Sequence, residues 1–321
     1  MDVLSDVLQV IRLSGAALFR ASLGAPWALI SSGTDSVMRQ FPMPVRRVTV
    51  FHVVIRGSCW VQRVSGPPQR LTAGDAVVLP RCDVHVLADE PGRKPVPTAE
   101  MLHGTPIFKL RDVTFGGEGG STQLLCGFLI CEQTDFEPLF AALPPLFRLS
   151  FRGGQGLPDL ESLIEYAVHE AISEGAGAAS SRLRAAELLF VEALRRYMVG
   201  LGPDDAGWLA GLRDPVIGKA LALMHEQPCY PWTVTELAGE VALSRSALAG
   251  RFSTLLGEPP MHYLARWRLV LAARQLRDSH RSVAAIAESI GYESSAAFQR
   301  AFKRIHGETP AACRKRLQRT A

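Results

Sequence analysis

Two stretches near the C-terminal end decide the fold of this chain: residues 237–260 read LAGEVALSRSALAGRFSTLLGEPP, and residues 286–310 read IAESIGYESSAAFQRAFKRIHGETP. Equivalent positions lie 49 residues apart before the central turn and 50 apart after it, where Ser244 is matched by Ser294. One extra residue therefore sits in the turn of the second copy. Self-similarity of this kind indicates a duplicated structural unit.

Each copy has the pattern of two short helices joined by a tight turn. Thr233, followed three residues later by Glu236, forms a capping box that starts the first helix of the first copy. Ser244 and Ser294 are suited to cap the second helix of their copies, and a glycine follows each of those helices. We therefore predict two helix-turn-helix units, over about residues 233–256 and 282–306.

Between the copies, the sequence PMHYLARWRLVLAARQLRDS predicts one long helix that begins at Pro260. About 18 residues of helix span roughly 27 Å. A stiff helix of that length would hold two recognition helices about one turn of DNA, or ~34 Å, apart. We expect the two units to enter successive major grooves on one side of the duplex.

The charge of the chain is unevenly divided. From Asp214 to the end there are 15 Lys and Arg against 9 Asp and Glu, a net +6, whereas the remainder has 20 against 22, a net −2. A basic domain attached to a nearly neutral one is typical of a nucleic-acid-binding protein, because neutralising phosphates supplies most of the non-specific affinity. A solvated basic face is the alternative interpretation of the charge alone.

On these residues, the stretch from Asp214 to Arg316 resembles the DNA-binding domain of the AraC/XylS family. The resemblance rests on LAGEVALSRSALAGRF, on GEPPMHYLARWRLVLAARQL and on IAESIGYESSAAFQRAFKRIHGETPAACR. It implies a sequence-specific transcription regulator with double-stranded DNA as its partner, often an activator that touches RNA polymerase.

The candidate DNA contacts are the positions of the two recognition helices that the core does not use. Arg300 is suited to guanine and Gln299 to adenine, whereas arginine and lysine at other positions would meet phosphates. Gly250 and small neighbours make direct readout by the first unit doubtful, so we expect the second unit or DNA shape to carry much of the discrimination. The candidates are Arg245, Ser246, Ala249 and Arg251 in the first unit and Ser295, Ala296, Gln299, Arg300, Lys303 and Arg304 in the second.

The N-terminal part reads as short β-rich runs between Gly and Pro, which predicts a sandwich or small barrel from about Phe41 to Ile130. Residues 3–11 have helical spacing and are expected to pack on that barrel. The stretch LTAGDAVVLPRCDVHVL (71–87), with Gly74 and Asp75 turning a hairpin, and FHVVIRGSCWV (51–61) resemble the cupin-type sensor domain of one AraC-like subgroup. This resemblance implies a barrel that holds a small-molecule effector.

His52, Trp60 and His85 are the candidate effector-binding residues. A metal-binding cupin enzyme fused to a DNA-binding module is the alternative, but cupin enzymes need an H-x-H pair, and Val53 and Val54 follow His52. His52, His85, His103, Cys59 and Cys126 are the side chains that would have to converge on a metal. We expect neither metal nor cofactor, because a buried core histidine is the simpler role for His85. A ligand-independent DNA-binding protein is a third reading.

Residues 151–213 are expected to form a helical linker that ends in a Gly- and Pro-rich stretch. Within it, one apolar seam follows a 3-4 spacing that could join two subunits in a homodimer or could cover the chain's own barrel. The seam residues are Leu183, Ala186, Phe190, Ala193 and Tyr197.

The predicted fold class is thus multidomain α+β: a cupin-like β-barrel over residues 1–150, a helical linker over 151–213 and an all-α double helix-turn-helix domain over 214–321. Asp2 and Asp6 interrupt any export signal, and no stretch approaches 18 apolar residues. Six cysteines are present without a CxxC pair, which argues against a zinc ribbon or a disulfide framework. We therefore expect a cytoplasmic protein with no membrane association.

Overall fold

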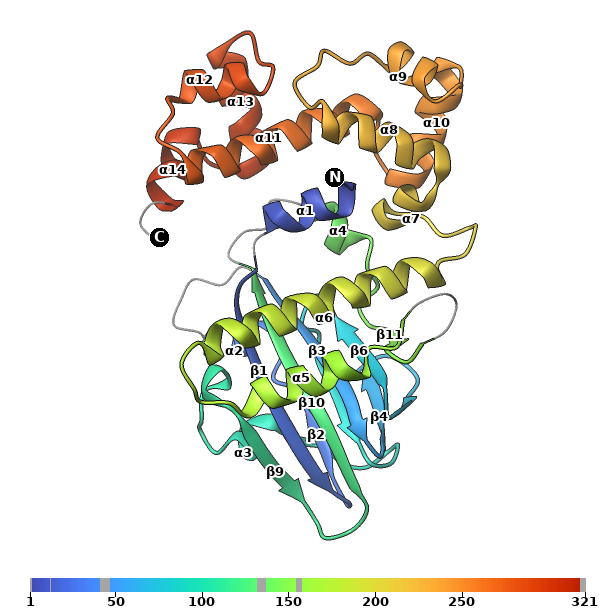
Figure 1. Cartoon of the computed structure of the whole chain (residues 1–321), viewed down its shortest axis with the longest axis vertical. Coiled ribbons are helices and arrows are strands. Elements are labelled where there is room, and N and C mark those ends of the chain that lie inside the picture. The colour runs from blue at the N-terminus through green and yellow to red at the C-terminus, as the bar shows by residue number, and fades with distance from the viewer. Residues whose placement is uncertain (1, 12, 41–46, 132–136, 154–157, 318–321) are drawn as a thin grey trace. The chain divides into compact units, whose positions relative to one another are not determined.

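The computed structural model describes residues 2–11, 13–40, 47–131, 137–153 and 158–317. The chain divides into two compact units, and neither is continuous in sequence. The barrel unit comprises residues 12–134 and 143–201, and the helical unit comprises residues 1–11, 135–142 and 202–321. Figure 1 shows the strands gathered in the first unit and the duplicated helices in the second.

The barrel unit is built from two β-sheets. The larger sheet has the strand order β11 (Phe147–Ser150), β6 (Asp75–Leu79), β3 (Arg47–Arg56), β10 (Ser121–Cys131), β1 (Leu13–Gly24) and β9 (Asp112–Gly116). The smaller sheet has the order β5 (Gln69–Thr72), β4 (Ser58–Arg63), β7 (His85–Ala88), β2 (Ala28–Ile30) and β8 (Val96–Pro97). One apolar core draws on both sheets, so the cupin-like fold expected from the sequence is confirmed.

The larger sheet is covered on both faces, which explains why β3 has seven consecutive buried residues, Thr49 and His52 among them. One face contributes to the shared core, and α5 (Glu161–Ile172) and α6 (Ala178–Gly200) pack against β1 and β10 on the other. Close packing also fixes a glycine in β10. A Cβ on Gly127 would come within 2.0 Å of the Phe51 ring on the paired strand β3, so only glycine fits there.

The helical seam expected to join two subunits is used inside the barrel unit. Ala186, Phe190 and Ala193 are buried, and the ring centroids of Tyr197 and Phe147 lie 4.7 Å apart. Because α6 packs on β1, β10 and β11 of its own chain, this seam is not available for dimerisation. Of the two interpretations of the spacing, the structure favours the cover of the barrel.

The turn at Gly74 differs from the predicted hairpin. Gly74 has a φ of +87°, as a tight turn requires, and Asp75 accepts hydrogen bonds from the backbone N–H and the hydroxyl of Thr72. However, β5 and β6 belong to different sheets. The turn is therefore a corner that carries the chain from one sheet to the other, and the ion pair of Asp75 with Arg148 of β11 secures it.

The helical unit contains elements from three parts of the sequence. They are α1 (Val3–Ile11), α4 (Glu137–Ala141), α7 (Trp208–Arg213), α8 (Pro215–Glu226), α9 (Val234–Glu240), α10 (Arg245–Leu256), α11 (Pro260–Asp278), α12 (Val283–Ser289), α13 (Ser295–His306) and α14 (Pro310–Leu317). The remaining short helices, α2 (Thr34–Met38), α3 (Thr98–Leu102) and the 3₁₀ turn η1 (Ile107–Lys109), belong to the barrel unit.

The N-terminal helix corrects one expectation. Its helical spacing is confirmed, but α1 belongs to the helical unit, where it packs on α8 and α11. Val3, Val7, Val10 and Ile11 are all buried. An amphipathic pattern specifies that one face must be covered and does not specify by what.

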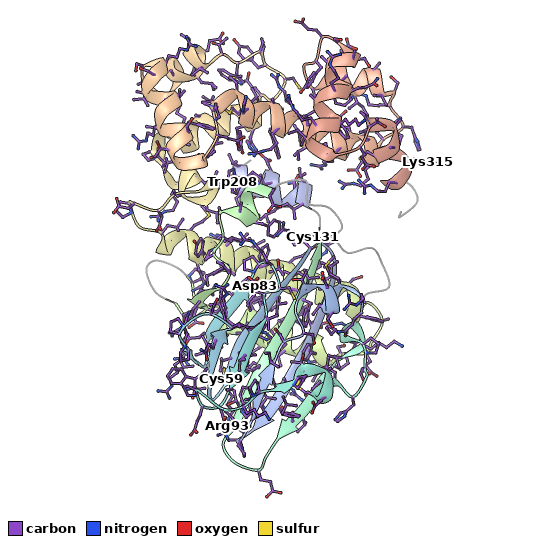
Figure 2. All side chains as sticks on the ribbon, turned by 180° about the vertical axis from the view of Figure 1, so that it is seen from behind. Cys59, Asp83, Arg93, Cys131, Trp208 and Lys315 are labelled. Carbon is purple, nitrogen blue, oxygen red and sulfur yellow. The ribbon has the colours of Figure 1, made fainter. Side chains whose placement is uncertain are left out.

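The expected linker before residue 214 also contains structure. The helix α7 packs on α8 and α10, and Trp208 is buried. Figure 2 labels Trp208 in this unit. Its indole N–H donates to the Tyr263 hydroxyl over 3.0 Å, and that oxygen lies 2.7 Å from Nε2 of His225. Asp6 of α1 lies over the same histidine, with Oδ2 3.5 Å from Nδ1, so four helices meet at one buried polar junction.

The duplicated segments form the predicted helix-turn-helix units. The first is α9 and α10 with the capping box of Thr233 and Glu236, and the second is α12 and α13. Ser244 and Ser294 cap α10 and α13 as expected, and Gly257 and Gly307 end them in the left-handed conformation. The 19-residue α11 connects the units, which lie at its two ends (Figure 1).

Candidate nucleic-acid interface and ligand cavity

The second recognition helix, α13, separates its core face cleanly from its outer face. Phe298 and Phe302 are buried against α11 and α12. The six sequence-predicted contact residues of this helix are all exposed: Ser295, Ala296, Gln299, Arg300, Lys303 and Arg304. The structure therefore brings them together on one solvent-facing surface, which we call the α13 face.

Arginine and glutamine side chains on the α13 face are available to a partner. Among the residues that the structure describes, no hydrogen bond or ion pair engages the guanidinium of Arg300, and the amide of Gln299 makes one long contact, 3.4 Å, to the Ser295 hydroxyl. A guanidinium can bond bidentately to guanine and an amide to adenine. Lys303 and Arg304 lie one turn further on, where their charges suit phosphates.

The first recognition helix, α10, presents a different surface. Arg245 and Ser246 are exposed, whereas Ala249 is half-buried. Ser246 lies 3.2 Å from the capping hydroxyl of Ser244. Small side chains thus dominate the outer face of α10, which offers fewer hydrogen-bonding groups than the α13 face.

Arg251, predicted to meet phosphate, has a partner inside the unit. Its Nε donates to Oδ2 of Asp214 over 3.0 Å. Asp214 also caps α8 through the backbone N–H groups of Val216 and Ile217, and these bonds together with Arg251 lower the pKa of its carboxyl, against the effect of burial. The geometry gives Arg251 a structural role in joining α10 to the start of α8.

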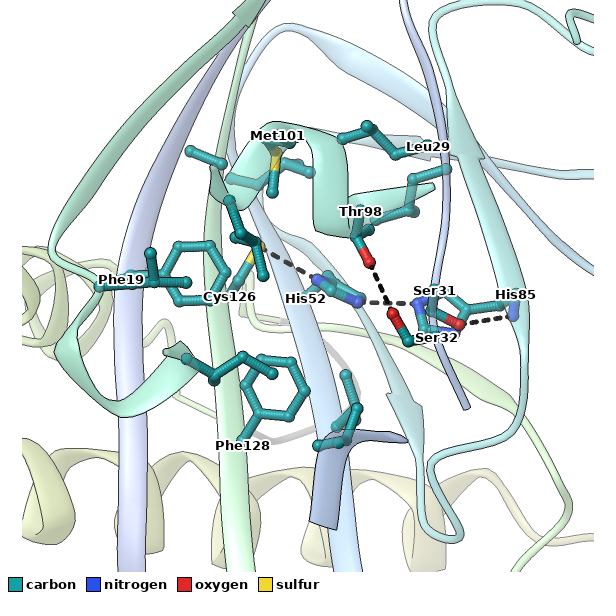
Figure 3. A pocket seen from close by; sticks show the side chains of 18 of the residues that line it. Phe19, Leu29, Ser31, Ser32, His52, His85, Thr98, Met101, Cys126 and Phe128 are labelled. Carbon is teal, nitrogen blue, oxygen red and sulfur yellow. Dashed lines mark hydrogen bonds between the residues drawn. The ribbon is translucent and has the colours of Figure 1, made fainter. Parts of the chain in front are cut away.

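The barrel unit contains a mainly apolar cavity of about 60 Å³ between its sheets and the short helices α2 and α3 (Figure 3). Strands β1 and β10 supply Phe19, Cys126 and Phe128, and α3 supplies Met101. The polar lining consists of Ser31, Ser32, Gln40, His52, His85 and Thr98.

Two of the three predicted effector residues, His52 and His85, line this cavity, and Trp60 does not. On β4 the neighbours Cys59 and Val61 are buried in the core, so Trp60 between them faces the other side of the strand. Because side chains alternate between the two faces of a strand, the sequence could have predicted that Trp60 points away from the core. Ser31, Ser32 and Thr98 were missed, because isolated hydroxyl residues next to short strands carry no sequence signal.

His52, His85 and Cys126 form a buried chain of hydrogen-bonding contacts. Nδ1 of His52 lies 3.1 Å from Sγ of Cys126, and its Nε2 lies 3.0 Å from Nε2 of His85. Nδ1 of His85 lies 2.9 Å from the backbone carbonyl of Asp83. Burial lowers the pKa of both histidines, with His85 adding to the effect on His52, so both rings are neutral near pH 7.

The carbonyl at the end of this chain fixes the position of every proton. A carbonyl only accepts, so Nδ1 of His85 carries the hydrogen and its Nε2 accepts from Nε2–H of His52. Nδ1 of His52 then accepts from the thiol of Cys126. Burial raises the pKa of that thiol, which keeps the sulfur protonated. We call this chain the thiol–histidine relay; it is neutral, and each of its ring nitrogens is occupied.

The relay is not accompanied by a metal-ligand set. Among the described residues, no group of three His, Cys, Asp or Glu side chains is placed to hold a metal ion. His103 is exposed at the end of α3 and does not line the cavity. Cys59 is buried nearby, with its pKa raised to about 12 by burial. Of the five side chains considered for a metal, only His52, His85 and Cys126 converge.

Within the described residues, none of the helices is both long enough and apolar enough to cross a membrane.

The chain resembles known proteins in both of its parts. Residues 2–199 match the family described as cupin, and residues 237–316 match the family described as helix-turn-helix domain. A putative AraC-like transcription regulator of Streptomyces lividans is 34% identical over 98% of both chains. One of Streptomyces antibioticus is 32% identical over 98% of this chain and 99% of its own. The HTH-type transcriptional regulator AlkR of Acinetobacter baylyi is 27% identical over 97% and 98%.

Proposed function

Because this chain belongs to the family of AraC-like transcription regulators with an N-terminal cupin domain, we propose that it reads an operator through α10 and α13 and that a small molecule in the barrel cavity changes this reading. Its full-length relatives are named transcription regulators, and this chain is likewise a DNA-binding regulator and not an enzyme. Its DNA partner is double-stranded.

The observation that carries the proposal is the α13 face. Six polar or small residues project from a helix whose opposite side is locked into a core by two phenylalanines. A rigid helix with an exposed guanidinium and amide can enter a major groove and read base edges. Arg300 and Gln299 read bases, with Ser295 and Ala296 closest to the start of the helix, whereas Lys303 and Arg304 hold phosphates.

The α10 face has a supporting role. Arg245 meets phosphate, and Ser246 and Ala249 allow the backbone to approach the groove closely. Because α11 separates the two units, they occupy grooves about one helical turn apart, and α13 carries most of the discrimination. A contact with RNA polymerase stays a prediction from the family resemblance, and a homodimer stays a prediction whose interface is not the seam of α6.

The proposal of effector control rests on the cavity. A largely apolar space with a few polar groups is typical of a small-molecule site, and it lies inside the matched cupin domain. The neutral thiol–histidine relay lines one wall of the cavity. A molecule that fills this space changes the packing of β1 and β10, two neighbouring strands of the larger sheet.

The proposal is tested by selecting operators for the full chain from a random duplex library, followed by footprinting. We expect two half-elements about 10 base pairs apart and an affinity that falls linearly with salt on logarithmic axes. The Gln299→Ala/Arg300→Ala variant should lose one half-element, and the matched exposed pair Glu288→Ala/Glu293→Ala should keep both. Recovery of unrelated sequences without a shared element would contradict the proposal.

A further inference from the structure

We propose that the barrel cavity takes an uncharged, mainly hydrocarbon molecule that carries one hydrogen-bond-accepting oxygen, held by the hydroxyl pair of Ser32 and Thr98. This inference rests on the proposed function, because it gives the chemical class of the effector. It concerns the same cavity and adds which molecules the cavity admits and which it rejects.

The wall of the cavity excludes a charged ligand. Of the described residues that line it, none is Asp, Glu, Lys or Arg, and most are aliphatic or aromatic. Phe19 and Phe128 stack with their ring centroids 6.3 Å apart on the neighbouring strands β1 and β10. A carboxylate or an ammonium group would lose its water there without gaining a counter-ion, which strongly disfavours binding.

The thiol–histidine relay cannot supply the missing charge. Both of its rings are neutral, and the proton order fixed by the Asp83 carbonyl leaves each ring nitrogen already paired. A polar ligand group that bonded to His52 would have to break the contact to Cys126 or the contact to His85. The relay therefore presents a satisfied and uncharged surface, which suits the hydrocarbon part of a ligand.

The hydroxyl pair is a part of the lining with spare hydrogen-bonding capacity, where Ser32 is exposed and Thr98 is half-buried. Ser32 Oγ and Thr98 Oγ1 lie 3.3 Å apart, and Figure 3 shows both hydroxyls next to the relay. Two hydroxyls share one hydrogen bond between them, so one proton is left to donate. Ser31 Oγ accepts the backbone N–H of His85 over 2.9 Å and keeps its own proton, so it is a further hydroxyl donor beside the pair. A carbonyl or ether oxygen of the ligand would accept from the pair.

The cavity volume of about 60 Å³ holds only part of a six-carbon molecule, so the rest of such a ligand would extend into the neighbouring groove. A groove lined by Arg39, Gln40, Leu102 and Phe108 adjoins the cavity and shares Gln40 and Leu102 with it. These two shared residues mark the side from which a molecule would enter.

The test measures binding of four six-carbon probes to the full chain by calorimetry at pH 8: 2-hexanone, 1-hexanol, hexanoate and hexylammonium. They share a hydrocarbon body and differ in the head group. We expect both neutral probes to bind at least tenfold more tightly than either ion. Equal or tighter binding of hexanoate or hexylammonium, or no binding of the neutral probes, would overturn the proposal.

Two variants locate the site. Ala21→Leu fills the cavity from β1 and should abolish binding of 2-hexanone, whereas Ser22→Leu, on the opposite face of the same strand, should not. The double variant Ser32→Ala/Thr98→Ala should bind 2-hexanone about fivefold more weakly. Undiminished 2-hexanone binding by Ala21→Leu, with a native circular dichroism spectrum, would place the molecule elsewhere and overturn the proposal.

A second readout separates this inference from the proposed function. If 2-hexanone saturates the cavity and operator affinity does not change, the proposal of effector control is contradicted, whereas the proposed ligand class is supported. If only a charged molecule binds and operator affinity changes with it, the proposed ligand class is contradicted, whereas the proposal of effector control is supported.

Discussion

Ala242 occupies in the first helix-turn-helix unit the position that Gly291 occupies in the second, and both have left-handed backbone conformations, with φ of +55° and +82°. The chain thus repeats one turn geometry with two different residues. An alanine in this conformation costs about 1 kcal/mol or more, which glycine avoids.

We therefore predict that Ala242→Gly stabilises the helical unit by about 1 kcal/mol. The reciprocal change, Gly291→Ala, should destabilise it by more, because a Cβ there would also lie 3.2 Å from the backbone oxygen of Cys229. Urea unfolding of the full chain, with hydrogen exchange of residues 234–256 and 283–306, measures both effects. Opposite signs for the two variants are required; the same sign would contradict the repeated geometry.

Arg300→Ala should weaken operator binding by about 1–3 kcal/mol and relax the preference at one base pair. Lys303→Ala should instead weaken binding to all sequences alike. It should also reduce the slope of log affinity against log salt concentration by about one. Competition binding with single-base operator variants at several salt concentrations separates the two patterns. An unchanged ranking of base substitutions for Arg300→Ala would remove this residue from base readout.

Arg251→Ala should leave the salt slope of operator binding unchanged. The guanidinium is paired with Asp214, so its loss acts on the junction of α8 and α10 and not on a phosphate. The cost in unfolding free energy should be at most about 1 kcal/mol, since the pair is partly exposed. Arg245→Ala, whose side chain is exposed, serves as the comparison; a fall in slope for Arg251→Ala would restore it as a phosphate contact.

The barrel unit should lose stability as the pH falls below about 6.5. His52 and His85 have lowered pKa values in the folded chain, so at acidic pH the unfolded chain binds more protons, and stability rises with pH until the unfolded histidines are neutral. Each such proton contributes a slope of up to about 1.4 kcal/mol per pH unit. Urea unfolding between pH 5 and 8 measures how the free energy of unfolding depends on pH. The variant His52→Gln should make this dependence flatter.

Val7→Asp should destabilise the helical unit by about 3 kcal/mol or more, because it places a carboxylate where α1 is fully buried against α8 and α11. Ser5→Asp, on a less buried position of the same helix, is the matched control. Hydrogen exchange should show the loss of protection in α8 and α11. Loss confined to the barrel strands would mean that α1 packs where the sequence first suggested.

The sequence determined what depends on neighbours along the chain. The caps at Thr233, Ser244 and Ser294, the glycine stops and the buried faces of the duplicated helices follow from spacings of three or four residues, because a helix satisfies its backbone locally. Exposure of the α13 face followed as well, since residues that alternate with Phe298 and Phe302 must point outward.

Only the tertiary structure decided which distant surfaces meet. The apolar stripe of α1 could have covered either unit, and the pairing of Arg251 with Asp214 depends on how α10 and α8 pack. His52, His85 and Cys126 lie on three strands that the sheets bring together, and their proton order depends on the Asp83 carbonyl. Burial and long-range pairing create these relationships, and the spacing of residues along the chain does not predict them.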